Sequence, residues 1–222
     1  MSSRQEEKEQ RKRERLEREA AAAAAAKRKR LLQIGGGVVL ASVVVVGVVL
    51  AVAGGGSSKS RTSETAVASA AKAAACDYRT FPSEGRGHVT QTRTAADYKT
   101  NPPTSGDHNP TPAPDGNYPA GNEPAVENWV HTLEHGRVLL MYKPGSPQET
   151  VTALQKLYEE PVLSSGKSYH MVLMQNNTKM PFETAAVAWQ RYIGCNDLGP
   201  KAIDAMRKFR DRYVDHGPEF IP

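Results

Sequence analysis

The sequence predicts an α+β fold, a small sheet with helices on one face, preceded by a proline-rich loop region and by one N-terminal transmembrane helix. Three observations lead to this prediction. Residues 34–53 form an uncharged apolar run, residues 81–124 are dense in proline and turn-forming residues, and short apolar runs alternate with amphipathic segments after residue 124. A layer of helices on one face of a short sheet buries these apolar residues most simply.

Residues 34–53 are long enough to cross a membrane, because twenty helical residues span about 30 Å. Four basic residues, 27–30, precede this segment, and the first lysine after it is Lys59. The positive-inside rule therefore places residues 1–33 in the cytoplasm as a basic tail and the C-terminal domain outside the cell membrane. A cleaved signal peptide is the alternative, since residues 66–68 resemble a cleavage site. The long apolar core and the distance to that site favour a retained anchor.

The positive charge belongs to the cytoplasmic tail. Residues 1–30 contain eleven Lys and Arg against six Glu, which accounts for the whole net charge of +5. The remaining residues balance at eighteen of each sign. A nucleic-acid-binding domain usually carries a basic patch, so no nucleic acid partner is expected.

Residues 54–75 are rich in Gly, Ser, Ala and Thr and are predicted to be a flexible linker, which leaves residues 76–222 as the extracytoplasmic domain. The two cysteines, Cys76 and Cys195, bracket most of that domain. In an oxidising compartment a disulfide between them would stabilise the fold by roughly 4 to 5 kcal/mol, because it closes a long loop. The alternative is two buried free thiols.

Regular structure is expected after the proline-rich stretch. The predicted strands are residues 138–142, 169–174 and 185–193. One helix is predicted from the capping box at residues 146–149 to Pro161, and a last helix begins at Gly199-Pro200.

All six histidines lie in the exported domain. His131 and His135 share one face whether residues 131–135 are helical or extended. In a helix, His-x-x-Glu-His is the inverted zincin signature, with two zinc ligands and Glu134 activating water. In a strand, Glu134 would point to the opposite face from the two histidines. The hydrolase mechanism would then fail, but a metal site would remain possible. The sequence leaves this choice open.

His108 follows a rigid Pro-Pro turn that could bring it near this pair. The candidate metal ligands are therefore His88, His108, His131 and His135, with Glu134 as a further carboxylate. Histidines with a carboxylate favour zinc, whereas mixed His/Met ligation favours copper. The sequence also places three methionines near His170, namely Met171, Met174 and Met180.

Three motifs carry a family resemblance. They are Pro-Pro-Thr-Ser-Gly-x-His at residues 102–108, Val-His-x-Leu-Glu-His-Gly-x-Val at residues 130–138, and Gly-Pro-Glu at residues 217–219. Over roughly residues 76–219 the chain resembles the bacterial membrane-anchored family called domain of unknown function 3105. The resemblance implies an N-terminal anchor and an exported domain. That family usually reads Trp-Gly-Arg where this chain has Trp189-Gln190-Arg191.

These observations give three hypotheses of function. The first is a membrane-anchored extracytoplasmic domain that binds copper or zinc through histidines. The second is a non-catalytic envelope interaction protein whose histidines are structural, and the third is a metal-dependent hydrolase using the His-x-x-Glu-His pattern. The sequence identifies no protein partner.

Overall fold

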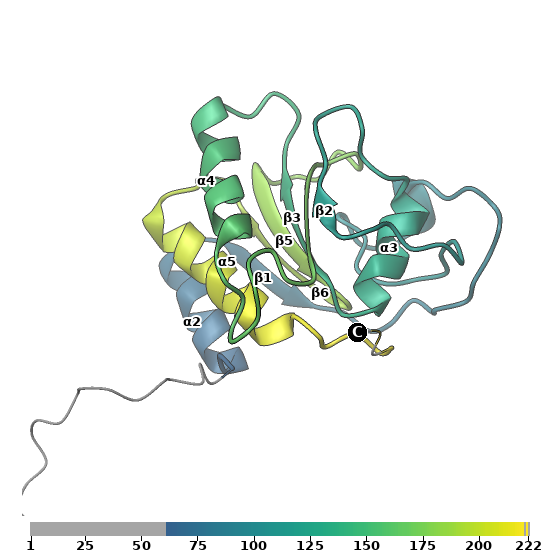
Figure 1. Cartoon of the computed structure of the whole chain (residues 1–222), viewed down its shortest axis with the longest axis horizontal. Coiled ribbons are helices and arrows are strands. Elements are labelled where there is room, and N and C mark those ends of the chain that lie inside the picture. Colours follow the sequence, from purple (N-terminus) through teal and green to yellow (C-terminus); the bar gives the residue numbers. More distant parts are fainter. Residues whose placement is uncertain (1–60, 220, 222) are drawn as a thin grey trace, which may run out of the picture. The chain divides into compact units, whose positions relative to one another are not determined.

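The computed structural model describes residues 61–219 and residue 221. In this part of the chain a six-stranded mixed sheet runs in the order β1-β6-β5-β3-β4-β2 (Figure 1), which confirms the α+β class. The strands are β1 (Asp77–Thr80), β2 (Gly116–Asn117), β3 (Val138–Tyr142), β4 (Met171–Gln175), β5 (Thr184–Ala188) and β6 (Arg191–Cys195). The helices are α2 (Glu64–Ala73), α3 (Val126–Glu134), α4 (Gln148–Glu159) and α5 (Pro200–Tyr213), with a short 3-10 helix η1 (Ala95–Asp97).

The predicted cytoplasmic tail and transmembrane helix, residues 1–33 and 34–53, lie outside the described residues. Within residues 61–219 and 221, no helix combines the length and the apolar character that a membrane crossing requires.

Strand β3 lies at the centre of the sheet, and all five of its residues are buried. It pairs in parallel with β4 and antiparallel with β5. A strand covered on both faces has a continuous apolar sequence, which is why this strand could be predicted with its correct bounds.

The predicted single strand 185–193 is instead a hairpin of β5 and β6. The chain reverses at Trp189 and Gln190, and Gln190 adopts a left-handed φ of 63°. The sequence reads as one apolar run here, and the reversal could not be predicted because neither turn residue is a glycine. The left-handed backbone explains why a glycine suits this position.

One face of the sheet, here called the helical face, is covered by α2, α4 and α5 (Figure 1). Helix α2 corrects the predicted linker, since residues 64–73 are helical rather than flexible. The Ser63 side chain accepts a hydrogen bond from the Ala66 N–H, and Val67 and Ala71, one turn apart, are buried in the core of this face. The alanines that suggested a linker are also strong helix formers.

The two C-terminal helices begin close to the predicted positions. Helix α5 starts at Pro200 with Gly199 before it, as expected. Helix α4 starts at Gln148, but the predicted capping box does not form, because the Ser146 hydroxyl makes no hydrogen bond.

The other face of the sheet, here called the loop face, is covered by α3 and the proline-rich stretch, residues 81–124 (Figure 1). This corrects the prediction that helices lie on one face only. Alternate residues of β3 and β5 are apolar on both sides, so both faces need cover. Helix α3 supplies it with an apolar stripe at helical spacing, Val126, Trp129, Val130 and Leu133, all buried.

Cys76 and Cys195 form a disulfide, as predicted. The bond joins the start of β1 to the end of its antiparallel neighbour β6, where Asp77 pairs with Gly194. It closes a loop with a sequence separation of 119 residues.

Candidate metal centre

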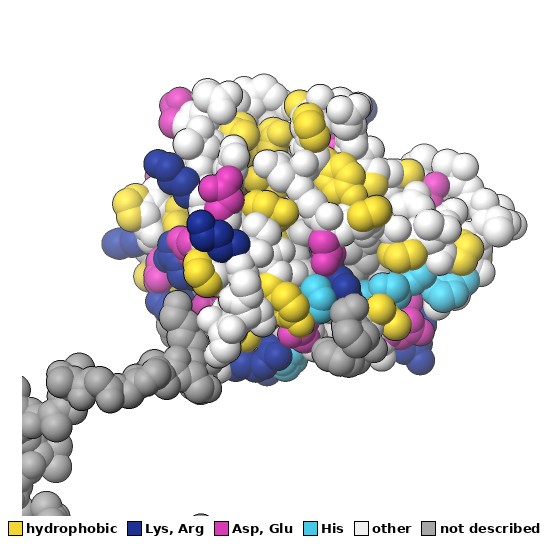
Figure 2. Space-filling model, viewed as in Figure 1, with side chains coloured by type: hydrophobic (Ala, Val, Ile, Leu, Met, Phe, Trp, Pro, Cys, Tyr) yellow, Lys and Arg dark blue, Asp and Glu magenta, His cyan; other side chains and the backbone are white. Residues whose placement is uncertain are grey.

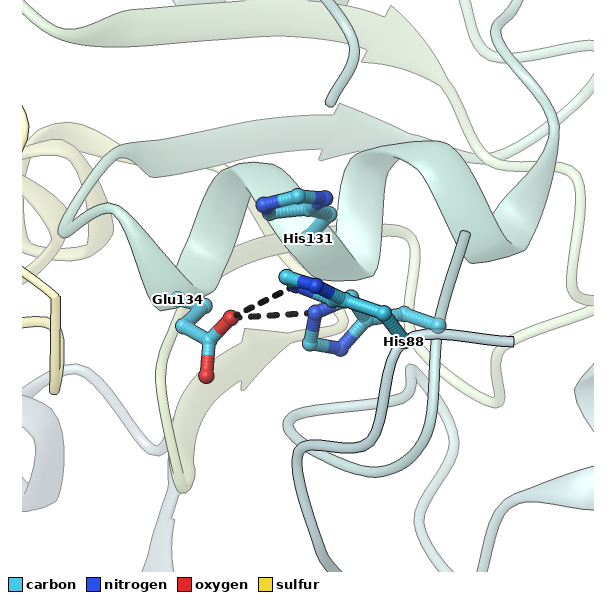
Figure 3. A group of neighbouring side chains, drawn as sticks. His88, His131 and Glu134 are labelled. Atoms are coloured by element: carbon cyan, nitrogen blue, oxygen red, sulfur yellow. Dashed lines mark ion pairs between the residues drawn. The ribbon is translucent and has the colours of Figure 1, made fainter. Parts of the chain in front are cut away.

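The His-x-x-Glu-His segment is helical, which resolves the choice left open by the sequence. His131 and Glu134 lie in the last turn of α3, and His135 is the residue at its C-cap. Gly136 follows with a φ of +79°, so the helix ends at a glycine in a left-handed conformation, the usual arrangement at this place. His131 and Glu134 project from the same side of the helix (Figure 3).

Two further histidines come from the proline-rich stretch, which is folded against itself. His88 and His108 form a β-bridge, because the His108 N–H donates to Gly87 O at 2.9 Å and its carbonyl accepts from Val89 N–H at 2.8 Å. Gly106, at φ +129°, lets the backbone pass close to the Tyr98 ring, which a Cβ would approach to 2.9 Å. His108 thereby lies beside His131 of α3, with the two ring centroids 4.7 Å apart.

These segments bring four side chains together. His88, His108, His131 and Glu134 each offer one ligand atom, and these atoms all lie within 4.8 Å of one another. Glu134 Oε2 lies 3.0 Å from His108 Nε2 and 3.6 Å from His88 Nε2. Figure 3 shows the carboxylate of Glu134 directed toward His88. The side chains of His108 and Glu134 are buried, whereas that of His88 is 44% exposed. The group therefore has one open side.

Backbone carbonyls orient two of these rings. His108 Nδ1 lies 2.7 Å from Gly106 O, and His131 Nδ1 lies 2.7 Å from Asn109 O. A carbonyl oxygen can only accept, so Nδ1 carries the proton in both rings and Nε2 keeps a lone pair in the neutral form. Carbonyl-held imidazoles of this kind are typical of metal ligands, because the hydrogen bond fixes both tautomer and direction.

The buried atoms that face one another are unpaired acceptors. Although 3.0 Å apart, His108 Nε2 and Glu134 Oε2 form no hydrogen bond, and neither Glu134 oxygen has any hydrogen-bond partner. Burial lowers the pKa of His108 and of His131, and burial raises the pKa of Glu134. At neutral pH these imidazoles are therefore uncharged, and they can donate lone pairs to a cation.

His135 belongs to a second group rather than to the first. With His131 and Glu219 it forms a set whose ligand atoms again lie within 4.8 Å. His135 Nε2 is 2.9 Å from His131 Nε2 and 3.7 Å from Glu219 Oε2. Burial and the neighbouring His131 lower the pKa of His135 to about 4. Glu219 was missed as a ligand, although the Gly-Pro-Glu motif that contains it was recognised.

The remaining candidates lie elsewhere. His170 Nδ1 pairs with Asp215 Oδ1 at 2.6 Å, and His216 is exposed. Met171 packs in the core of the helical face, and Met174 and Met180 in that of the loop face. These methionines therefore serve as core residues.

Comparison with known proteins gives one match. The model of the family described as "Protein of unknown function (DUF3105)" matches residues 88–220, a range that contains all six residues of the two ligand groups. No curated protein and no solved structure matches the chain.

Proposed function

Since the chain belongs to the DUF3105 family of proteins of unknown function, we propose its function from the site itself: it is a membrane-anchored extracytoplasmic domain that binds one transition metal ion. The proposed ligands are His88, His108, His131 and Glu134, the inner group. His135 stays outside this set.

One observation carries this proposal: two fully buried acceptors, His108 Nε2 and Glu134 Oε2, face each other at 3.0 Å without a hydrogen bond. A buried carboxylate with no partner is costly, by several kcal/mol per ion in general. A metal ion would accept both lone pairs and neutralise the carboxylate. A histidine with a purely structural role, in contrast, would be expected to form a hydrogen bond with such a neighbouring carboxylate.

The donor set favours a borderline divalent ion. Three imidazoles and one carboxylate suit zinc, whereas Cu(I) favours the soft sulfur ligands that the inner group lacks. We therefore propose zinc first and Cu(II), which also takes imidazole ligands, second.

Two features support a position outside the cytoplasm. The basic residues lie before segment 34–53, and disulfides such as Cys76–Cys195 persist mainly in oxidising compartments. We propose that segment 34–53 holds the domain at the cell membrane.

Elemental analysis of the full chain, purified in detergent, tests the metal proposal. We expect one ion per chain, with affinity reduced at least about 10- to 100-fold in His108→Ala and His131→Ala, because even second-sphere losses have effects of this size. His216→Ala is the matched control, since His216 is exposed and outside both groups. A chain that binds no metal, with thermal stability indifferent to chelators, would refute the proposal and favour the envelope interaction module.

The helical His-x-x-Glu-His segment also keeps the hydrolase hypothesis testable, because His131 Nε2 and His135 Nε2 are only 2.9 Å apart. In that mechanism both rings bind the ion and Glu134 activates water. Here Glu134 lies among the inner ligands, which favours metal binding over hydrolysis. A Glu134→Gln chain that keeps full metal affinity but loses a measured hydrolysis would reverse this preference.

A further inference from the structure

The second group has the composition of a metal site of its own. His131, His135 and Glu219 supply two imidazoles and a carboxylate, and are here called the outer group. Three protein ligands of these types are sufficient to hold a zinc-like ion with water at the remaining position.

The two groups cannot both be occupied, because they share His131. Its Nδ1 is committed to Asn109 O at 2.7 Å, which leaves Nε2 as the only ligand atom of that ring. One nitrogen lone pair binds one ion. The inner and outer groups are therefore alternative positions for a single ion. The ion can pass from one to the other by exchanging its other ligands while it stays bound to His131 Nε2.

The outer carboxylate is closer to solvent than the inner one. The side chain of Glu219 is 42% exposed and that of His135 12%, whereas Glu134 and His108 of the inner group are 1% and 0% exposed. His88, at 44%, is the inner ligand that reaches solvent. Figure 2 shows histidine side chains at the molecular surface. An arriving hydrated ion can meet the Glu219 carboxylate before it meets Glu134.

The C-terminal tail fixes Glu219 in place. The Glu219 N–H donates to Glu134 O at 3.1 Å, and the Asp215 N–H donates to Gly136 O at 2.8 Å. Gly217 passes so close to α3 that a Cβ there would lie 2.0 Å from Glu134 O. Glu134 therefore anchors the outer carboxylate through its backbone while its own side chain serves the inner group.

From this geometry we infer that the outer group is a loading position for the metal ion, which then moves to the inner group while His131 Nε2 stays bound. In the transfer the ion releases His135 Nε2 and a Glu219 oxygen. It gains His88 Nε2, His108 Nε2 and Glu134 Oε2, so three protein ligands become four and the inner position holds it more tightly. The inference rests on the proposed function.

Stopped-flow loading of the full chain with Co²⁺ tests the inference, because bound Co²⁺ reports its ligands through its visible spectrum. We expect His135→Gln and Glu219→Gln to slow loading at least about 10-fold, while the final spectrum and the stoichiometry of one ion stay those of the native chain. Glu219→His, which restores a ligand, should recover much of the rate. Glu183→Gln is the matched control, because Glu183 is also 42% exposed and lies outside both groups.

The outcomes separate the two proposals. Unchanged loading rates in His135→Gln and Glu219→Gln would mean that ions enter directly past the exposed His88, and would overturn the loading position alone. Two ions per chain, or a changed final spectrum in His135→Gln, would overturn it as well. A native chain that binds neither Co²⁺ nor Zn²⁺ would overturn the proposed function together with this inference.

Discussion

The two faces of the sheet each bury a charged side chain at 1% exposure, and they treat it in opposite ways. On the helical face, Arg210 donates to Leu157 O at 2.9 Å and to Asp211 Oδ1 at 2.8 Å, and lies 3.4 Å from Glu160 Oε2. On the loop face, Glu134 accepts no hydrogen bond at either oxygen.

This difference separates structural from functional burial of charge. A paired buried charge contributes to the fold, and removing its partner is destabilising. An unpaired one destabilises the fold unless something absent from the polypeptide completes it. The helical face is therefore the part of the domain that supplies stability, and the loop face is the part that holds a site.

The largest expected effect concerns the helical face, where Cys195 lies in the core. Removing the disulfide with Cys76→Ala/Cys195→Ala should lower the free energy of unfolding by about 4 to 5 kcal/mol, because a loop of separation 119 regains its freedom. Denaturant unfolding of the chelator-treated chain measures it. Metal stoichiometry under native conditions should not change, and a loss of metal from the folded variant would break the division between the faces.

The next effect compares the two buried charges directly. Arg210→Met should lower the free energy of unfolding by about 3 kcal/mol, since Asp211 loses its cation and Glu160 keeps only Arg207. Glu134→Gln should instead raise the free energy of unfolding of the metal-free chain by about 1 to 3 kcal/mol, because it removes a buried charge that accepts no hydrogen bond.

Metal affinity should show the reverse order. Glu134→Gln should weaken metal binding at least about 10-fold, and Arg210→Met should leave it unchanged. Equal stability losses in the two variants would show that Glu134 is paired in solution, and the comparison would fail.

A smaller effect is the pH dependence of the metal-free chain. The pKa of His135 is about 4 in the folded state against an ordinary 6.5. The unfolded chain therefore binds more protons between these values, and stability falls as pH drops from about 6.5 to about 4, by about 2 kcal/mol for this group. The lowered pKa values of His108 and His131 act in the same direction, and the raised pKa of Glu134 opposes them.

Chemical denaturation with chelator at a series of pH values between 4 and 7 measures this slope. His135→Gln should flatten it, whereas the same change at exposed His216 should flatten it less. An equal slope in the native chain and in His135→Gln would contradict the assignment.

The smallest effect concerns the turn between β5 and β6. Gln190→Gly should raise the free energy of unfolding by about 0.5 to 1 kcal/mol, because glycine removes left-handed strain but has more freedom in the unfolded chain. Gln190→Ala should bring no such gain. The turn is held by the loop face, since Gln190 N–H donates to Thr104 O at 2.8 Å, so metal affinity gives a second readout of any distortion.

Sequence reasoning worked where a local pattern decides the structure. The buried strand at Val138–Tyr142 and the last helix from Pro200 follow from composition and caps alone. It failed where tertiary contacts decide. Helix α2 depends on packing against α5. Strands β1 and β2 are too short to show a recognisable strand pattern in the sequence.

The site followed the same rule. The histidines could be proposed from residue type, but only folding shows that Glu134 joins His88, His108 and His131 while His135 pairs with Glu219. Glu219 lies 84 or more residues from the other ligands in the chain, and no periodicity links them. The conformation of the Gly-Pro-Glu motif brings this distant carboxylate to α3.

The disulfide also divides the ligands by covalent topology. Its closed ring runs from Cys76 to Cys195 and contains His88, His108, His131, Glu134 and His135, whereas Glu219 lies outside the ring, after Cys195. An oxidised chain that unfolds keeps the inner ligands confined at a high effective concentration, while its outer carboxylate can drift away. A protease that cut the tail just after Tyr213 would remove the outer position and leave every inner ligand within the ring.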